Sequence, residues 1–185
     1  MPQEDCCQAL SIPPSRKYES DGGPGIRAIY DLLKGSDVPD EDHQTLFKAQ
    51  IVFWLLGATD GHAKNFSIRL APGGRFRLTP LYDIVSTQPS LDAKQITQNQ
   101  MKLAMAVGAN RHYVVHTILG RHFRQTADAC GLPAKILNQI IQEIADTAKA
   151  KIDQRLAQLP ASLPAAVAQS VAEGAKRRID TLVTI

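Results

Sequence analysis

Cysteine is scarce in this sequence, and its placement argues against a framework of disulfide bonds. The chain has 185 residues and three cysteines, Cys6, Cys7 and Cys130. Adjacent cysteines rarely pair with each other, and an odd number leaves at least one thiol free. Cys6 and Cys7 also lack the Cys-x-x-Cys spacing or nearby histidine of a structural zinc site. We therefore expect a protein of the reducing cytosol.

Long apolar segments and targeting signals are missing as well. The longest apolar run, residues 51–56, is far shorter than the roughly 20 residues that cross a membrane, and it predicts a buried helix segment. The first residues are polar and acidic, unlike a secretory signal peptide. A net charge of +3 is too small to indicate a nucleic-acid surface. These absences favour a cytoplasmic globular domain without membrane association.

The glycine-rich loops that cradle phosphates in many nucleotide-binding proteins are absent too. Residues 22–25, Gly-Gly-Pro-Gly, lack the Lys-Ser/Thr of a P-loop and the G-x-G-x-x-G spacing of kinases. We interpret them as a structural turn that leads into the first helix. The basic cluster at residues 176–178 is interpreted as a solvated helix face, because the net charge is modest.

Most of the sequence shows the apolar periodicity of helices. Residues 1–25 look irregular, because prolines and glycines interrupt them repeatedly. Apolar residues at helical spacing, together with start and stop signals, predict helices at residues 25–33, 40–57, 116–130, from 133 onward, and 164–183. The fold class that follows is mainly α (α+β).

Two short hairpins are predicted between these helices. Residues 66–70 and 75–78 alternate between apolar and polar side chains, and the turn Ala-Pro-Gly-Gly joins them. A weaker alternation around residues 101–105 and 112–114 predicts a second hairpin.

Three polar side chains around the first hairpin form the strongest chemical pattern. Asp60 and Asn65 lie in a polar loop directly after the buried helix, and Asp83 follows the hairpin. Because the hairpin folds the chain back, we expect Asp83 to lie close to Asn65. Protein kinases use this spacing to place a catalytic Asp and two Mg²⁺ ligands. On the residues alone a plain alternative is equally open, in which Asp60 caps a turn, Asn65 begins a strand and Asp83 is solvated.

A family resemblance favours the kinase interpretation. Residues 54–68, Trp-Leu-Leu-Gly-Ala-Thr-Asp-Gly-His-Ala-Lys-Asn-Phe-Ser-Ile, closely resemble the catalytic loop of HipA-type serine/threonine kinases, the toxins of bacterial HipA–HipB toxin–antitoxin modules. Residues 77–84, Arg-Leu-Thr-Pro-Leu-Tyr-Asp-Ile, resemble the metal-binding segment of that family. Residues 17–25, 102–105 and 121–123 also look like the family, and the likeness is loosest after about residue 133.

The resemblance implies a role for each residue of the site. Asp60 would be the catalytic base that accepts the proton of the substrate hydroxyl, and Asn65 and Asp83 would hold Mg²⁺. Contacts to ATP are implied for His62, Ala63, Lys64, Asn65, Tyr82 and Asp83. The open alternatives are a loop histidine bonded to the backbone for His62 and a solvated surface lysine for Lys64.

The sequence shows no counterpart of the N-terminal lobe that covers the nucleotide in a kinase. Nothing before Asp60 shows the strands, glycine loop or strand lysine of an N-terminal lobe. We therefore expect residues 1–185 to form a kinase-like C-terminal lobe, with residues 1–25 as an irregular lead-in and the hairpins at the active-site edge. Such a lobe would be inactive alone.

The same resemblance implies the partners. It suggests phosphorylation of a protein serine, with glutamyl-tRNA synthetase as the target and persistence as the outcome, and binding to a HipB-like antitoxin. DNA would be contacted only through the antitoxin, since no predicted helix carries a basic stripe. The alternatives are a non-catalytic module that binds the antitoxin and, less favoured, a small-molecule phosphotransferase.

Overall fold

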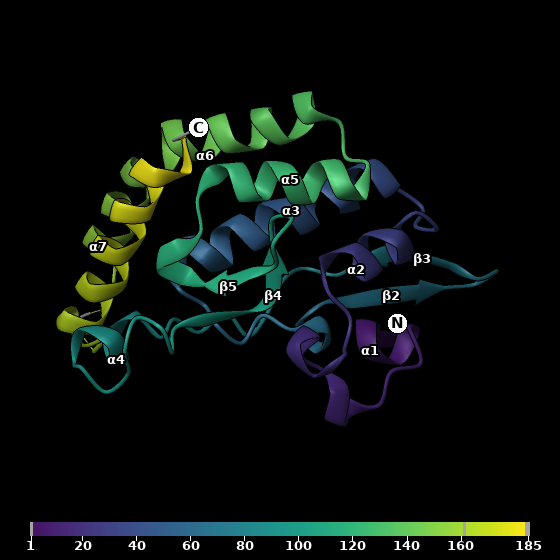
Figure 1. Cartoon of the computed structure of the whole chain (residues 1–185), viewed down its shortest axis with the longest axis horizontal. Coiled ribbons are helices and arrows are strands. Elements are labelled where there is room, and N and C mark those ends of the chain that lie inside the picture. Colours follow the sequence, from purple (N-terminus) through teal and green to yellow (C-terminus); the bar gives the residue numbers. More distant parts are fainter. Residues whose placement is uncertain (1, 161, 184–185) are drawn as a thin grey trace.

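The chain folds mainly into helices, with two small antiparallel sheets (Figure 1). The computed structural model describes residues 2–160 and 162–183. The predicted α+β class is confirmed. The helices are α1 (Cys6–Ala9), α2 (Ile26–Leu33), α3 (Pro39–Leu56), α4 (Gln88–Asp92), α5 (Gly120–Cys130), α6 (Ala134–Ala157) and α7 (Ala165–Leu182). The strands are β1 (Gln3–Asp5), β2 (Ser67–Ala71), β3 (Arg75–Leu78), β4 (Lys102–Val107) and β5 (His112–Val114).

Helix α3 is the central element, and its ends follow from the sequence. Pro39 occupies the first turn, where its missing N–H costs nothing, and three acidic residues follow near the positive end of the helix dipole. Gly57 ends the helix with a left-handed φ of 65°. Helices α2, α6 and α7 pack against α3, which explains why its apolar run is buried or half-buried throughout.

The end of α3 is anchored by Trp54. Its ring packs against Phe123 of α5, with 5.5 Å between ring centroids, and its Nε1 donates a hydrogen bond of 3.0 Å to the carbonyl of Val115. The predicted core role of this tryptophan is confirmed, because it is 1% exposed. The loop after α3, which contains the predicted site residues Asp60 and Asn65, therefore begins at a well-anchored helix end.

The first sheet has the strand order β1-β2-β3 and contains one strand that the sequence analysis missed. The predicted hairpin is confirmed as β2 and β3, paired from Ile68 opposite Leu78 to Ala71 opposite Arg75. Strand β1 adds to the other edge, with Gln3 opposite Arg69. The expectation of an irregular lead-in is therefore wrong for residues 3–9. A three-residue strand depends on its partner and leaves little periodicity to detect.

The second predicted hairpin is confirmed as β4 and β5, but the next helix begins later than expected. Residues 115–117 form a 3-10 turn, and α5 starts only at Gly120. A side chain at Gly120 would place its Cβ 1.9 Å from the carbonyl oxygen of Leu182. Glycine at the start of α5 thus allows close packing against the end of α7, a contact that local sequence does not reveal.

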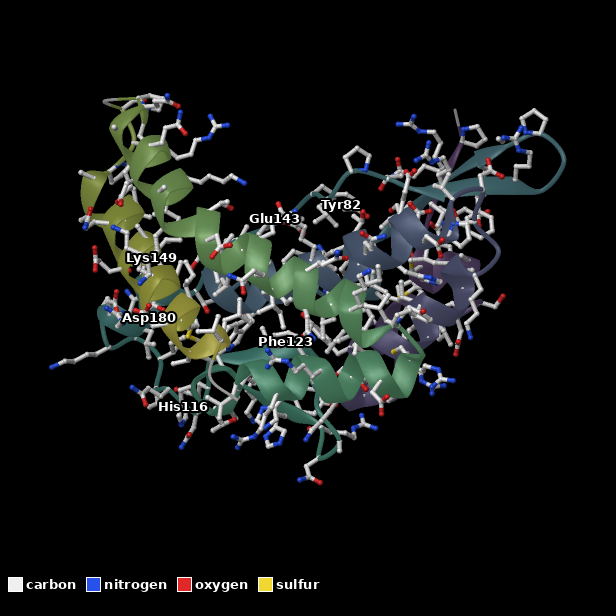
Figure 2. All side chains as sticks on the ribbon, turned by 90° about the horizontal axis from the view of Figure 1, so that it is seen from above. Tyr82, His116, Phe123, Glu143, Lys149 and Asp180 are labelled. Atoms are coloured by element: carbon white, nitrogen blue, oxygen red, sulfur yellow. The ribbon has the colours of Figure 1, made fainter. Side chains whose placement is uncertain are left out.

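The long helices α6 and α7 lie side by side, and both contact α3, with α7 near the C-terminal end of α3 (Figures 1 and 2). Figure 2 shows Lys149 of α6 facing Asp180 of α7, and these two side chains form an ion pair. Lys176 pairs with Asp153 across the same interface at 2.6 Å. No helix in the described part of the chain is long and apolar enough to span a membrane.

Arg178 corrects the expectation that the basic cluster is a solvated face. Its Nε donates to the carbonyl of Leu55 and its Nη1 to the amide oxygen of Gln88, each at 2.8 Å. Burial lowers the pKa of Arg178 to about 10, so it stays charged at neutral pH. Arg178 therefore ties α7 to the end of α3 and to α4, a short helix that the sequence analysis did not predict.

Candidate active site

The polar loop after α3 is held in place by backbone contacts and close packing. The amide of Ala58 donates to the carbonyl of Phe53 at 2.8 Å, which turns the chain back over the end of the helix. A Cβ at Gly61 would lie 2.3 Å from the ring of Phe53, so only glycine fits there. This packing presents Asp60 at the surface, where its side chain is 54% exposed.

Two ring systems flank the carboxylate of Asp60. The hydroxyl of Tyr18 donates a hydrogen bond of 2.5 Å to its Oδ1. The Nε2 of His62 lies 3.7 Å from the same oxygen, too far for a hydrogen bond. Tyr18 was not among the predicted site residues. Its only signal in the sequence was its place in the family-like segment 17–25.

Asn65 and Asp83 meet as predicted. The Nδ2 of Asn65 donates a hydrogen bond of 2.8 Å to Oδ2 of Asp83, and Oδ1 of Asn65 accepts the backbone N–H of His62 at 3.2 Å. The hairpin makes this approach possible, because the amide of Thr79 bonds back to the carbonyl of Ser67 at 2.8 Å. Asp83 also has a positive φ of 57°, a conformation that Asp tolerates better than most residues.

Tyr82 and Lys64 make contacts within the protein. The hydroxyl of Tyr82 donates to the backbone carbonyl of Lys64 and bonds to the hydroxyl of Ser67, each at 2.6 Å. Lys64 is neither fully solvated nor aimed at the carboxylates of the loop, since its Nζ lies 3.6 Å from the carboxylate of Asp5, the last residue of β1. The strand that the sequence analysis missed therefore supplies a counter-charge to a predicted site residue.

His62 is the main unsatisfied group of the site. It is 4% exposed, and neither of its ring nitrogens has a hydrogen-bond partner among the described residues. The imidazole nevertheless faces the backbone of the following 3-10 turn, Ala63–Asn65, in a capping-box arrangement, as in the alternative of a loop histidine directed at the backbone. Burial lowers the pKa of His62, partly opposed by the charge of Asp60. Buried polar atoms without a partner are uncommon, so these ring nitrogens are free to bond to a polar ligand. Ala63, next in the loop, is fully buried.

The donor set suits a magnesium ion that is shared with a substrate. Asn65 and Asp83 offer an amide and a carboxylate, the hard oxygen ligands that Mg²⁺ prefers, and its usual protein sites supply only one or two carboxylates. Phosphate oxygens and water would complete the coordination. Among the described residues no group of three or more His, Cys, Asp or Glu side chains could hold a metal by itself. The buried thiols of Cys6 and Cys7 form no such group.

A hollow of ≈ 530 Å³ lies next to the loop, on the side of Tyr18. Tyr18 and Thr59 form its wall nearest to Asp60, and the rest of the lining comes mainly from β4 and β5. The arrangement therefore has a pair of oxygen ligands, an exposed carboxylate and an adjoining hollow. Chemically, it can hold a metal-bound anion and accept a proton from a hydroxyl beside it.

Comparison with known proteins decides the family. The sequence profile of the HipA-like C-terminal domain matches residues 1–152. The chain belongs to this HipA family. The resemblance stated from the loop and hairpin sequences is thereby confirmed.

Named relatives of this HipA domain are kinases. It is 40% identical over 107 residues to the putative kinase Y4mE of Sinorhizobium fredii, covering 57% of this chain and 24% of that protein. It is 29% identical over 168 residues to the serine/threonine-protein kinase toxin HipA of Shewanella oneidensis, covering 84% of this chain and 36% of the toxin.

The fold of this HipA domain also matches a solved structure. A chain in the complex of Shewanella oneidensis HipA, HipB and operator DNA superposes with a TM-score of 0.80 and 25% sequence identity. The match covers 97% of the present chain and 42% of that one. The chain thus spans less than half of the length of each of these relatives.

Proposed function

We propose that this chain is the catalytic C-terminal lobe of a cytoplasmic serine/threonine protein kinase that transfers the γ-phosphoryl group of ATP to a protein serine. One observation carries the proposal most directly. Asn65 and Asp83 are hydrogen-bonded at 2.8 Å beside the loop that presents Asp60. Kinases need this set of a base and two metal ligands, because phosphoryl transfer depends on positioning and charge stabilisation.

Each side chain of the site has a distinct part in this proposal. Asn65 and Asp83 hold Mg²⁺, which supplies positive charge against the phosphates of ATP. Asp60 accepts the proton of the acceptor hydroxyl as it attacks the γ-phosphorus. His62 donates to a phosphate oxygen, which would satisfy one of its ring nitrogens. Lys64 adds positive charge after leaving Asp5, and Tyr82 holds the loop from the side of β3.

The proposal includes an N-terminal lobe that covers the nucleotide. Tyr82, Ile84 and Val85 follow β3 and are exposed, Val85 to 65%. Large apolar side chains gathered on one exposed segment mark a surface that another part of a protein covers. The length of the relatives supports the same idea, since each is more than twice as long as its match to this chain.

The direct test compares phosphoryl transfer with and without that lobe. Residues 1–185 alone, and the same residues supplied with a HipA-type N-terminal lobe, are incubated with Mg·ATP and a serine-containing acceptor. We expect phosphoryl transfer only when both lobes are present. In Asp60→Asn the transfer rate should fall by at least about 100-fold, the scale of a missing catalytic base. Full activity of residues 1–185 alone would contradict the two-lobe proposal. Unchanged turnover in Asp60→Asn would contradict the assigned base.

The acceptor and the cellular partner are proposed from the family. We infer that glutamyl-tRNA synthetase is the acceptor, that the outcome is growth arrest and persistence, and that a HipB-like antitoxin is the partner. The solved HipA structure with a similar fold was determined together with HipB and operator DNA, which supports the antitoxin part of this proposal.

A second candidate is a non-catalytic module that binds the antitoxin. An apolar groove between α3, α6 and α7 favours it. Leu159, Leu163 and Val167 line this groove and are each at least 40% exposed. Lys151 and Arg155 also line it and form no ion pair within the described chain, so the groove would suit an apolar helix with acidic flanks. Retained antitoxin binding by a protein without phosphoryl transfer would favour this candidate.

A further inference from the structure

Asp60 is contacted by a side chain from outside its own loop. The Tyr18 hydroxyl donates to Oδ1 of Asp60 at 2.5 Å, although the two residues are 42 positions apart in the chain. Within residues 2–160 and 162–183 no other side chain comes within hydrogen-bond distance of this carboxylate, since His62 stays at 3.7 Å. The second oxygen, Oδ2, is therefore left open on a half-exposed side chain.

We propose that Tyr18 is a positioning residue for the phosphoryl transfer described above: its hydroxyl fixes the orientation of Asp60 and leaves Oδ2 to take the acceptor's proton. This inference rests on the proposed function. The terminal torsion of an Asp side chain is broad when nothing restrains it, and an exposed carboxylate would sample many orientations. A charge-assisted O–H···O⁻ bond is short and strong enough to select one of them.

The segment that carries Tyr18 is held rigidly by its backbone. The carbonyl of Tyr18 accepts the amides of Asp21 and Gly23, at 3.1 Å and 2.9 Å. A Cβ at Gly23 would lie 2.0 Å from the carbonyl oxygen of Arg16, so no other residue fits this turn. Gly23 therefore shapes the turn that carries Tyr18, in line with the structural turn predicted for residues 22–25.

A neighbouring side chain also anchors this segment. The carboxylate of Glu19 accepts the amide of Ala106 in β4 at 2.6 Å. A Cβ at Gly25 would lie 2.6 Å from the same carboxylate, so glycine makes room for it. The segment is thereby fixed to the second sheet as well as to itself.

The surroundings of Tyr18 keep its hydroxyl protonated, so that it acts as a hydrogen-bond donor. The ring of Tyr18 meets His62 edge-on, with centroids 5.1 Å apart, and Lys17 Nζ lies 4.9 Å from its centroid. The hydrogen bond to Asp60, followed by burial, raises the pKa of Tyr18 to about 12. Its proton is therefore retained at neutral pH. Tyr18 also lines the hollow together with Thr59, so space for an acceptor adjoins the residue that holds Asp60.

The opposite interpretation makes a different prediction. A hydroxyl bonded to a catalytic base also resembles the acceptor itself, so Tyr18 would then compete with the substrate. Its removal would raise turnover or lower the KM for the acceptor. The positioning role requires that turnover falls while nucleotide binding is kept.

The experiment measures phosphoryl transfer by residues 1–185 supplied with a HipA-type N-terminal lobe, with γ-labelled Mg·ATP and glutamyl-tRNA synthetase as acceptor. We expect Tyr18→Phe to lower kcat by about 10–100-fold with the KM for Mg·ATP unchanged, the scale of a misplaced catalytic group. Tyr30→Phe is the matched control. It loses the same hydroxyl from a ring stacked on His43, and it should keep the wild-type kcat.

Other outcomes separate the inference from the proposed function. A wild-type kcat in Tyr18→Phe, an increased kcat, or a loss confined to KM would overturn the positioning role. An inactive wild type, or unchanged turnover in Asp60→Asn, would overturn the proposed function itself. NMR of the Asp60 side chain adds a readout independent of activity, because Tyr18→Phe should convert one side-chain rotamer into an average of several. A single rotamer in both proteins would contradict the inference.

Discussion

The hydroxyl of Tyr82 donates a hydrogen bond of 2.6 Å to the backbone carbonyl of Lys64, which ties the segment after β3 to the loop after α3. A phenol has one proton, so the bond to Ser67 at 2.6 Å must be donated by the serine. Three parts of the candidate site are thereby held together through one side chain.

Tyr82→Phe tests the importance of this tie. The substitution keeps the ring and removes only the hydroxyl, leaving the Lys64 carbonyl and the Ser67 hydroxyl without this partner. We expect a loss of about 1 kcal/mol in the free energy of unfolding, measured by urea denaturation, which is typical for one hydrogen bond. Mg·ATP affinity should fall at the same time. A variant with wild-type stability and affinity would show that the tie is dispensable.

Gly61→Ala should disturb the loop through sterics alone. The added Cβ would lie 2.3 Å from the Phe53 ring, and the ring is 2% exposed, so it has little room to move. Overpacking of this kind costs about 1–3 kcal/mol, and here it would also shift Asp60. Gly35→Ala is the control, because its Cβ would lie 3.4 Å from Phe76, an ordinary contact. Equal stability of the two variants would contradict the packing argument.

His122 predicts a pH dependence of stability. It is 4% exposed and stacks on His112 at 3.9 Å, and its Nδ1 accepts the amide of Leu119 at 3.2 Å. Burial, followed by the charges of His112 and Arg121, lowers its pKa below the ordinary 6.5. The unfolded chain therefore binds the proton more readily, and stability present above pH 6.5 should decline as the pH falls towards the folded pKa.

His122→Gln isolates this contribution. Glutamine at this third helical position can still bond back to the amide of residue 119, but it does not titrate. We expect urea midpoints of the variant to fall less between pH 7.5 and 5 than those of the wild type. His116→Gln, at an exposed histidine labelled in Figure 2, should retain the wild-type decline. Parallel declines in all three proteins would refute the assignment.

Val167→Asp tests the apolar groove as the surface for the antitoxin. Val167 is 44% exposed in the groove between α3, α6 and α7, so an added charge there should cost little stability. Binding of a HipB-like antitoxin, measured by calorimetry, should weaken by about 10-fold or more, as for a charge placed in an apolar contact. Val183→Asp, 47% exposed and not part of the groove lining, is the control. Equal affinities would remove the groove from consideration.

Local signals predicted much of this fold and the centre of the site. Gly57 and Gly131 stop helices because each takes a left-handed φ, and both were predicted as helix ends. The turn at residues 71–74 predicted the hairpin, and the hairpin predicted that Asp83 returns to Asn65. In each case the cause lies within a few residues of its effect.

The features that were missed depend on contacts between distant parts of the chain. Tyr18 reaches Asp60 across 42 positions, and Arg178 reaches Leu55 across 123. Strand β1 exists because β2 offers an edge, and Gly120 at the start of α5 lies close against a carbonyl of α7. Neither composition nor periodicity predicts which residues far apart in the sequence will contact each other. The chemical roles of Asp60, Asn65 and Asp83 stay predictions.

The central claim is that Asn65 and Asp83 hold the metal of a metal–ATP complex beside Asp60. The most direct test is paramagnetic broadening by Mn·ATP in NMR spectra of isotope-labelled residues 1–185, since weak binding suffices for this readout. We expect Mn·ATP to broaden selectively the signals of the Asn65 side-chain amide and of the backbone around Asp83. In Asp83→Asn these signals should no longer be broadened. Broadening centred elsewhere on the chain, or unchanged in Asp83→Asn, would contradict the claim.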